Sequence, residues 1–318
     1  MTQKKSDNLS IGDVISFISI MFLGIVVFFG MNFMTLGNKI PCIIVSILLV
    51  VLMTVFVFFA AFAKSQNKNQ KNWSVVKYAM VGLYLAVLAP CYIYSAKFCE
   101  IQFEQTEIVK KVDANVAAIN KMFDTYDQNC DARVNAYGYG LKALLNHDEG
   151  KEKLVRMLGL NSADDVNETA IEQAKESFLF KLKNVDYQAL EAQKDTLVQQ
   201  CANNFNNWNI LAVSQYASKL GNVQERYAQA LDDIYEKSKS DAEKDIPPFD
   251  AAQFAVSDNI AEQFSAFPSF SVGGLFVVLF LGFLGLVKFF TAPNPTVKEI
   301  KVGEASSIIK DGGGLVVK

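Results

Sequence analysis

Hydrophobic residues are concentrated in four uncharged blocks, at residues 14–33, 40–63, 78–96 and 269–287. A bilayer core of about 30 Å needs roughly 20 apolar residues in a helix, because no water is present there to pair with backbone groups. Buried helices of soluble proteins usually keep a polar stripe, and these blocks have none. The pattern therefore predicts four transmembrane helices, at residues 14–33, 40–63, 78–96 and 269–290.

The first block also follows Lys4 and Lys5, as the apolar part of a signal peptide would. It is longer than the roughly 7–15 apolar residues of a signal peptide. Residues 34–39 contain no clear small-x-small cleavage pattern. We therefore expect this block to be a retained membrane anchor.

Lysines near the four blocks are distributed unevenly, and positive residues favour the cytoplasmic side of a membrane. If the N-terminus is cytoplasmic, only Lys39 and Lys97 flank the opposite side. The lysines on the cytoplasmic side are then Lys4, Lys5, Lys64, Lys68, Lys71, Lys77, Lys288, Lys298 and Lys301. The sequence thus predicts that residues 1–13, 64–77 and 291–318 are cytoplasmic and that residues 97–268 lie outside.

The long segment at residues 97–268 has the pattern of helices. From Ile108 to Cys130, apolar residues recur at steps of three and four, which is the period of one helix face. A second such face runs from Tyr187 to Trp208. A helix start is expected at residues 162–165, where a serine precedes two acids. No Gly or Pro occurs at residues 91–137, so we expect the third span to continue outward as one rod.

These patterns predict an all-α fold, because runs of β-branched residues are missing from the long segment. The predicted protein has four membrane spans and an elongated helical hairpin or bundle ectodomain between spans three and four. A smaller helical insertion is expected at about residues 141–184, and the two rods of the hairpin are expected to pair as a coiled coil.

The formal net charge of −3 is the balance of two opposite contributions. Residues 97–270 hold 18 Lys and Arg against 28 Asp and Glu, a net charge of −10, and the rest of the chain carries +7. This division supports the predicted orientation, because basic residues suit the anionic cytoplasmic leaflet. The near-neutral total argues against a nucleic-acid-binding protein, which would carry a basic excess.

Residues that could carry catalysis or bind metal are sparse. The chain has one histidine, His147, in a segment expected to be an exposed loop, and no phosphate-binding, dinucleotide-binding or metalloprotease motif. The four apolar blocks lack the charged residues that proton and ion transport usually need. We therefore expect no catalytic residue, no metal site and no cofactor.

Two of the five cysteines, Cys130 and Cys201, fall on the predicted apolar helix faces. In an oxidising compartment they could form a disulfide that joins the two rods. They could equally be buried thiols that pack as small hydrophobic groups. The sequence leaves both interpretations open.

Small residues recur along one face of the fourth block, at Ser271, Gly274, Gly282 and Gly285. Small side chains allow two membrane helices to approach closely. We expect this face to pack against another helix, either within the chain or in a second copy of it.

The C-terminal tail has alternating apolar residues around a run of three glycines, a pattern typical of strand, turn and strand. Its apolar positions are Val297, Ile300, Val302, Ile308, Ile309, Leu315, Val316 and Val317. A two-stranded hairpin alone is marginal in water. The tail is therefore either flexible or adds strands to the sheet edge of a partner.

Architecture and exclusion leave three hypotheses for function. The first is a non-enzymatic scaffold subunit of a multiprotein cell-envelope assembly, such as a secretion or transport machine, in a bacterial inner membrane. The second is a membrane sensor or receptor whose periplasmic helical domain receives the input and whose partner supplies the output. The third is an accessory subunit of a channel or transporter. Expected partners are the lipid bilayer, other envelope proteins and a second copy of the chain, with no nucleic acid.

Overall fold

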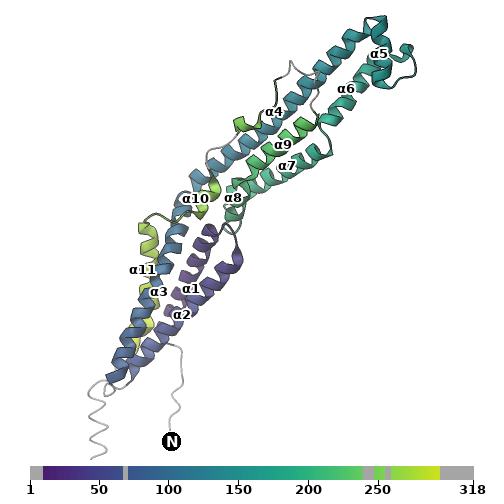
Figure 1. Ribbon diagram of the computed structural model, residues 1–318. Helices are drawn as coiled ribbons and strands as arrows, with labels where there is room; N and C mark the ends of the chain where they lie inside the picture. Colours follow the sequence, from purple (N-terminus) through teal and green to yellow (C-terminus); the bar gives the residue numbers. More distant parts are fainter. Residues whose placement is uncertain (1–9, 67–70, 239–246, 255–258, 294–318) are drawn as a thin grey trace, which may run out of the picture. The chain divides into compact units, whose positions relative to one another are not determined.

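The computed structural model of the chain describes residues 10–66, 71–238, 247–254 and 259–293 (Figure 1). All regular structure within these residues is helical, and none of them forms a strand. The predicted all-helical fold with four apolar helices is therefore confirmed for this part of the chain. The predicted tail hairpin, at residues 296–318, lies outside it.

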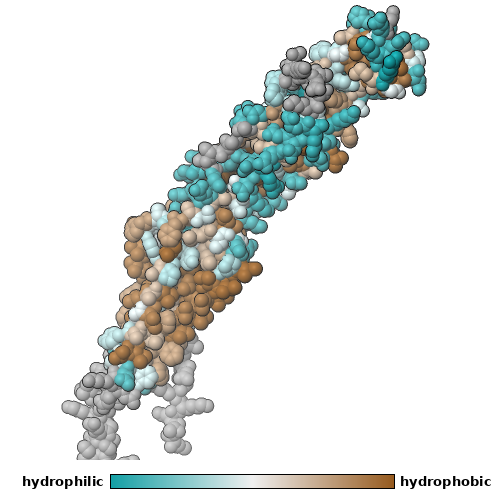
Figure 2. Space-filling model, viewed as in Figure 1, coloured by the Kyte–Doolittle hydropathy of each residue, from teal (hydrophilic) through white to brown (hydrophobic). Residues whose placement is uncertain are grey.

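Contacts divide the chain into two compact units. The apolar unit comprises Met1–Glu104 and Ser265–Lys318, and the polar unit comprises Gln105–Phe264. Hydrophobic residues cover the visible face of the first and hydrophilic residues much of the second (Figure 2). The helices long and apolar enough to cross a membrane all belong to the apolar unit, and they are Ile11–Met34, Lys39–Ser65, Asn72–Phe103 and Val272–Thr291. These four helices indicate a multi-pass membrane protein.

Five helices form the described part of the apolar unit: α1 (Ile11–Met34), α2 (Lys39–Ser65), α3 (Lys71–Phe103), α11 (Val272–Gly285) and α12 (Val287–Thr291). Helix α3 extends beyond the predicted span at both ends. The α1, α2, α3 and α11 helices pack against one another around a buried apolar core (Figure 1). The largest fully buried side chains of this core are Ile20, Leu23 and Tyr84.

Two close approaches of backbone determine how these helices pack. A Cβ added to Gly30 of α1 would overlap the carbonyl oxygen of Tyr94 in α3. A Cβ added to Gly274 of α11 would lie 2.5 Å from the Cα of Ala96, also in α3. Only hydrogen side chains fit at these two contacts, so α3 is the helix on which both α1 and α11 pack closely.

The small-residue face of α11 contacts α3 at each of its positions. The Ser271 backbone N–H donates to the Tyr92 hydroxyl over 3.3 Å, and the buried Gly274 lies against Ala96. Gly282 and Gly285 are buried beside the side chains of Leu88 and Tyr84, respectively. The Tyr84 hydroxyl donates to the carbonyl of Gly282 over 2.8 Å. In this structure the face is thus occupied by a helix of the same chain.

The polar unit contains seven α-helices among its described residues: α4 (Gln105–Leu145), α5 (Asp148–Leu158), α6 (Glu168–Leu182), α7 (Val185–Asn206), α8 (Val213–Gly221), α9 (Val223–Ser238) and α10 (Ile260–Ser265), the last of which ends one residue beyond the unit. Short 3-10 turns occur at η1 (Ala163–Asp165) and η3 (Ala251–Phe254). The long helix α4 is the common element, and α5, α6, α7 and α9 all pack against it (Figure 1).

Two sequence-based predictions about this unit are wrong in detail. Helix α3 ends at Phe103 and α4 begins at Gln105, so a single turn residue, Glu104, interrupts the predicted rod. The predicted helix start at Ser162 forms only η1, where the Ser162 hydroxyl accepts from the Asp164 N–H. Helix α6 begins later, because Asn167 caps it by accepting from the Ala170 N–H over 2.9 Å.

Replacing Gly274 with Val tests the packing of α11 on α3. The added side chain must displace the Ala96 backbone, so we expect unfolding free energy to fall by about 1–3 kcal/mol. The matched control is Gly82→Val, since a Cβ at Gly82 meets nothing within 4 Å. Both variants gain the same helix propensity, which cancels in the comparison. Equal thermal midpoints for the two purified, detergent-solubilised variants would contradict the packing described.

Candidate functional site

Charged side chains hold together one end of the apolar unit. The Lys288 Nζ of α12 lies 2.6 Å from the Asp13 carboxylate of α1, and its backbone N–H donates to the Ser16 hydroxyl over 2.8 Å. The Lys64 Nζ of α2 donates to the carbonyls of Phe289 and Phe290 over 2.8 and 2.9 Å. These contacts join the start of α1 and the end of α2 to α12. Lys64 and Lys288, both assigned to the cytoplasmic flank, therefore also stabilise the packing of these helix ends.

Lys97 is a charged residue whose environment the sequence did not reveal. It was predicted to lie on the outer flank of span three, but its side chain is fully buried in the structure. The Glu100 carboxylate, one helical turn onward, lies 3.8 Å from its Nζ. A buried ammonium group is unfavourable without such polar contacts. The Lys–Glu spacing of three residues was the available signal, but it does not distinguish a buried pair from a surface pair.

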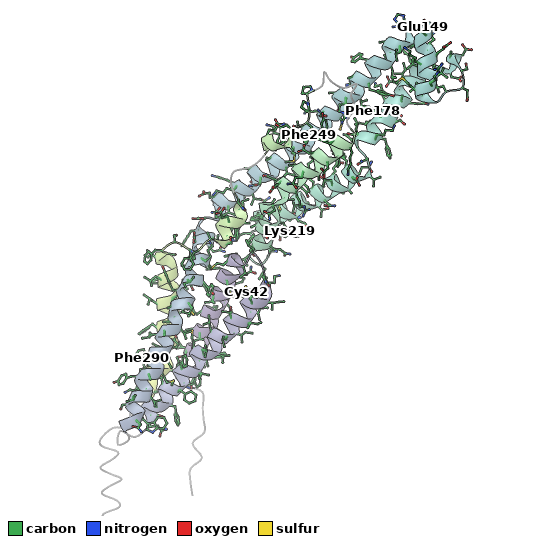
Figure 3. The ribbon with its side chains drawn as sticks, in the orientation of Figure 1. Cys42, Glu149, Phe178, Lys219, Phe249 and Phe290 are labelled. Carbon is green, nitrogen blue, oxygen red and sulfur yellow. The ribbon has the colours of Figure 1, made fainter. Side chains whose placement is uncertain are left out.

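Aromatic side chains form the centre of the polar unit. The rings of Tyr126 and Tyr187 stack with centroids 5.1 Å apart, and Phe249 meets Tyr126 edge-on at 5.2 Å. Phe123 packs edge-on against Tyr227 at 5.6 Å. This aromatic cluster, defined by these five residues, connects α4, α7, α9 and the segment before η3. Figure 3 labels its member Phe249. Such ring pairs stabilise a fold beyond the area that they bury.

Hydrogen bonds and charges surround the aromatic cluster. The Tyr187 hydroxyl donates to the Asp127 carboxylate over 2.5 Å, and the Lys183 Nζ lies 2.7 Å from the same oxygen. Burial raises the pKa of Tyr187 above its ordinary value, and the bond to Asp127 raises it further. Tyr187 is therefore a neutral donor at physiological pH, so this network acts as a fixed link between α4 and the α6–α7 connection.

Arg133 is the largest fully buried side chain of the described residues. Its guanidinium donates to the Ser238 hydroxyl over 3.0 Å and to the Ser238 carbonyl over 2.6 Å. The same group lies over the Tyr235 ring, 5.0 Å from its centroid. Arg133 thus connects α4 to the C-terminal end of α9 through hydrogen bonds and a cation–π contact.

The structure contains Cys130 and Cys201 as free thiols, each fully buried. Cys130 lies on α4 beside Tyr126, and Cys201 lies on α7. The proposed disulfide is therefore not present in this structure, and both thiols occupy core positions. Burial raises the pKa of Cys130 and of Cys201 to about 11 each. Both groups are accordingly protonated at neutral pH and are poor nucleophiles.

The described residues offer little for metal binding. No group of three or more His, Cys, Asp and Glu side chains among them is arranged to hold a metal ion. His147 is exposed and lies in a bend, where it is the N-cap residue of helix α5. This position agrees with the exposed loop expected there. The tail residues Val297, Ile300, Val302, Ile308, Ile309, Leu315, Val316 and Val317 lie outside the described part of the chain.

Comparison of the chain with protein-family models, with curated proteins and with solved structures finds no significant match.

Thiol titration distinguishes the two interpretations of Cys130 and Cys201. When the purified protein is denatured without reductant, we expect all five cysteines to react with a chromogenic thiol reagent. A Cys130→Ser/Cys201→Ser variant should then lose two reactive thiols. If a disulfide joins the pair, the unreduced wild-type protein will give the same count as this variant, which would contradict the structure.

Proposed function

We propose that this chain is a membrane-anchored interaction subunit whose helical polar unit presents a surface to other proteins of a cell-envelope assembly. In this proposal the termini face the cytoplasm of a bacterial inner membrane, and the polar unit projects from the other side as an elongated bundle. The lysine distribution supports the orientation, because Lys64 and Lys288 lie at the helix ends assigned to the cytoplasm.

One observation carries the proposal: large apolar side chains are exposed on an otherwise polar unit. Tyr139 of α4 is 75% exposed, Met157 of α5 is 59% exposed and Phe180 of α6 is 64% exposed. Helices α5 and α6 each pack against α4. Large apolar groups exposed on a hydrophilic surface commonly mark a protein–protein contact.

A groove at the same three helices strengthens this assignment. It has a volume of about 470 Å³, and its lining includes both apolar and polar side chains. Figure 3 labels one of the lining residues, Phe178. The Tyr137 and Phe178 rings, 4.8 Å apart, form part of its wall. The remaining lining residues are Met157, Leu158, Leu160, Ala170, Gln173, Ala174, Ser177 and Lys181. We call this groove, which includes the exposed Met157, the α5–α6 surface.

Site-specific photocrosslinking tests the proposal in the native cell. A photoreactive phenylalanine analogue is placed at Met157 or Ser177, which are both exposed and line the groove, and control positions are the exposed Asp113 and Asp124 of α4. We expect discrete crosslinked protein bands from the first two positions and none from the controls. Mass spectrometry of the bands identifies the partner.

Equal crosslinking at all four positions would indicate random collision and would contradict a defined surface. A chain that crosslinks at none of them, and that purifies in mild detergent as a lone monomer, would contradict the interaction role itself.

A further inference from the structure

A second groove in the polar unit lies between α7, α8 and α9, and its lining has a distinctive charge. Its volume is about 510 Å³, within the range of small-molecule sites. Lys219 of α8 and Arg226 of α9 line it, and no acidic side chain is among its described lining residues. Figure 3 shows Lys219 at the α8 helix.

The two cations stand out because the polar unit is strongly acidic. Residues 105–264 contain 26 Asp and Glu against 17 Lys and Arg. Despite this excess of carboxylates, neither Lys219 nor Arg226 forms an ion pair with any residue that the structure describes. The Lys219 side chain is exposed, and its Nζ lies over the Tyr216 ring, 4.5 Å from the centroid.

Neutral groups in the groove complement the cations. Gln193 and Gln200 of α7 supply amide groups that can donate hydrogen bonds to oxygen atoms. Leu197 and Tyr227 are buried beneath them and give the groove an apolar floor. The first residue of helix α9, Val223, also lines the groove.

We propose that this groove binds a small organic anion. A carboxylate or phosphate group of the ligand contacts Lys219 and Arg226, and its apolar part covers Leu197 and Tyr227. The guanidinium of Arg226 suits a planar carboxylate or a phosphate, to which it can donate two hydrogen bonds. This assignment is independent of the α5–α6 surface, which lies on other helices.

Isothermal titration calorimetry of the full chain in detergent micelles tests the assignment. The probes are phenyl phosphate, which has both an anionic and an apolar part, inorganic phosphate, and the neutral benzyl alcohol. We expect saturable binding of phenyl phosphate, weaker binding of inorganic phosphate and no saturable binding of benzyl alcohol. Binding should weaken as salt is added, because the contacts are electrostatic.

Variants locate the binding to the groove. Lys219→Gln/Arg226→Gln should weaken phenyl phosphate binding at least about tenfold, or about 1.4 kcal/mol. The matched control, Lys153→Gln/Arg156→Gln, removes the same two charges from exposed positions on α5 and should bind like wild type. The charge-conserving Lys219→Arg/Arg226→Lys variant should retain most of the affinity. Circular dichroism confirms that each variant is folded.

Three results would overturn the proposal. The first is no saturable binding of phenyl phosphate up to about 10 mM. The second is equal loss of binding in the control and groove variants, which would show a general charge effect. The third is binding of poly-glutamate but not phenyl phosphate, which would assign the groove to an acidic polypeptide. None of these results affects the crosslinking test of the α5–α6 surface.

Discussion

A backbone N–H or C=O group inside a lipid bilayer has no water to bond with, and the four apolar helices satisfy these groups within the chain itself. The same constraint explains how polar side chains are placed in the apolar unit. The Tyr84 hydroxyl donates to a backbone carbonyl of α11, Lys64 donates to two backbone carbonyls of α12, and Asp13 pairs with Lys288. Each of these polar groups therefore contacts another polar group.

Association of the four helices depends on shape, since lipid tails are as apolar as the helix surfaces. Helix α3 receives both α1 and α11 at glycine positions where a side chain would not fit. The polar unit is held together differently. Its long helix α4 contributes Phe123 and Tyr126 to a buried aromatic cluster, and Asp127 and Arg133 anchor the neighbouring helices through directional bonds. Water is available to this unit, so burial of apolar area is its main source of stability.

The parts of this fold that are predictable from sequence are those that depend on local periodicity. The uncharged blocks predicted the four apolar helices, and the face of α4 that includes Ile108, Val112 and Ile119 is buried as its spacing indicates. One position departs from the predicted burial: the apolar Val116 is only half-buried, and the adjacent polar Asn115 is buried instead. The helix start was predicted at Ser162 and not at Asn167, because a serine followed by two acids is a typical helix start and gives no sign that the turn ends after three residues.

Features that depend on contacts between distant segments were not predictable. The burial of Lys97 follows from the helices around it, because the spacing of Lys97 and Glu100 fits a buried pair and a surface pair equally. The cationic groove brings Lys219 and Arg226 to α7, whose residues Gln193 and Gln200 precede them in the chain by about 20–30 positions. No spacing rule connects such residues, so only the tertiary structure shows that they share one site.

Cysteine accessibility measures the membrane arrangement most directly. Single cysteines are introduced at the exposed positions Asn38, Ser65 and Glu176, and intact cells are treated with a membrane-impermeant maleimide. The five native cysteines are buried and provide the background. A four-span chain with cytoplasmic termini predicts labelling of Asn38→Cys and Glu176→Cys in intact cells, and of Ser65→Cys only after permeabilisation. Labelling of all three positions from the same side would contradict the account.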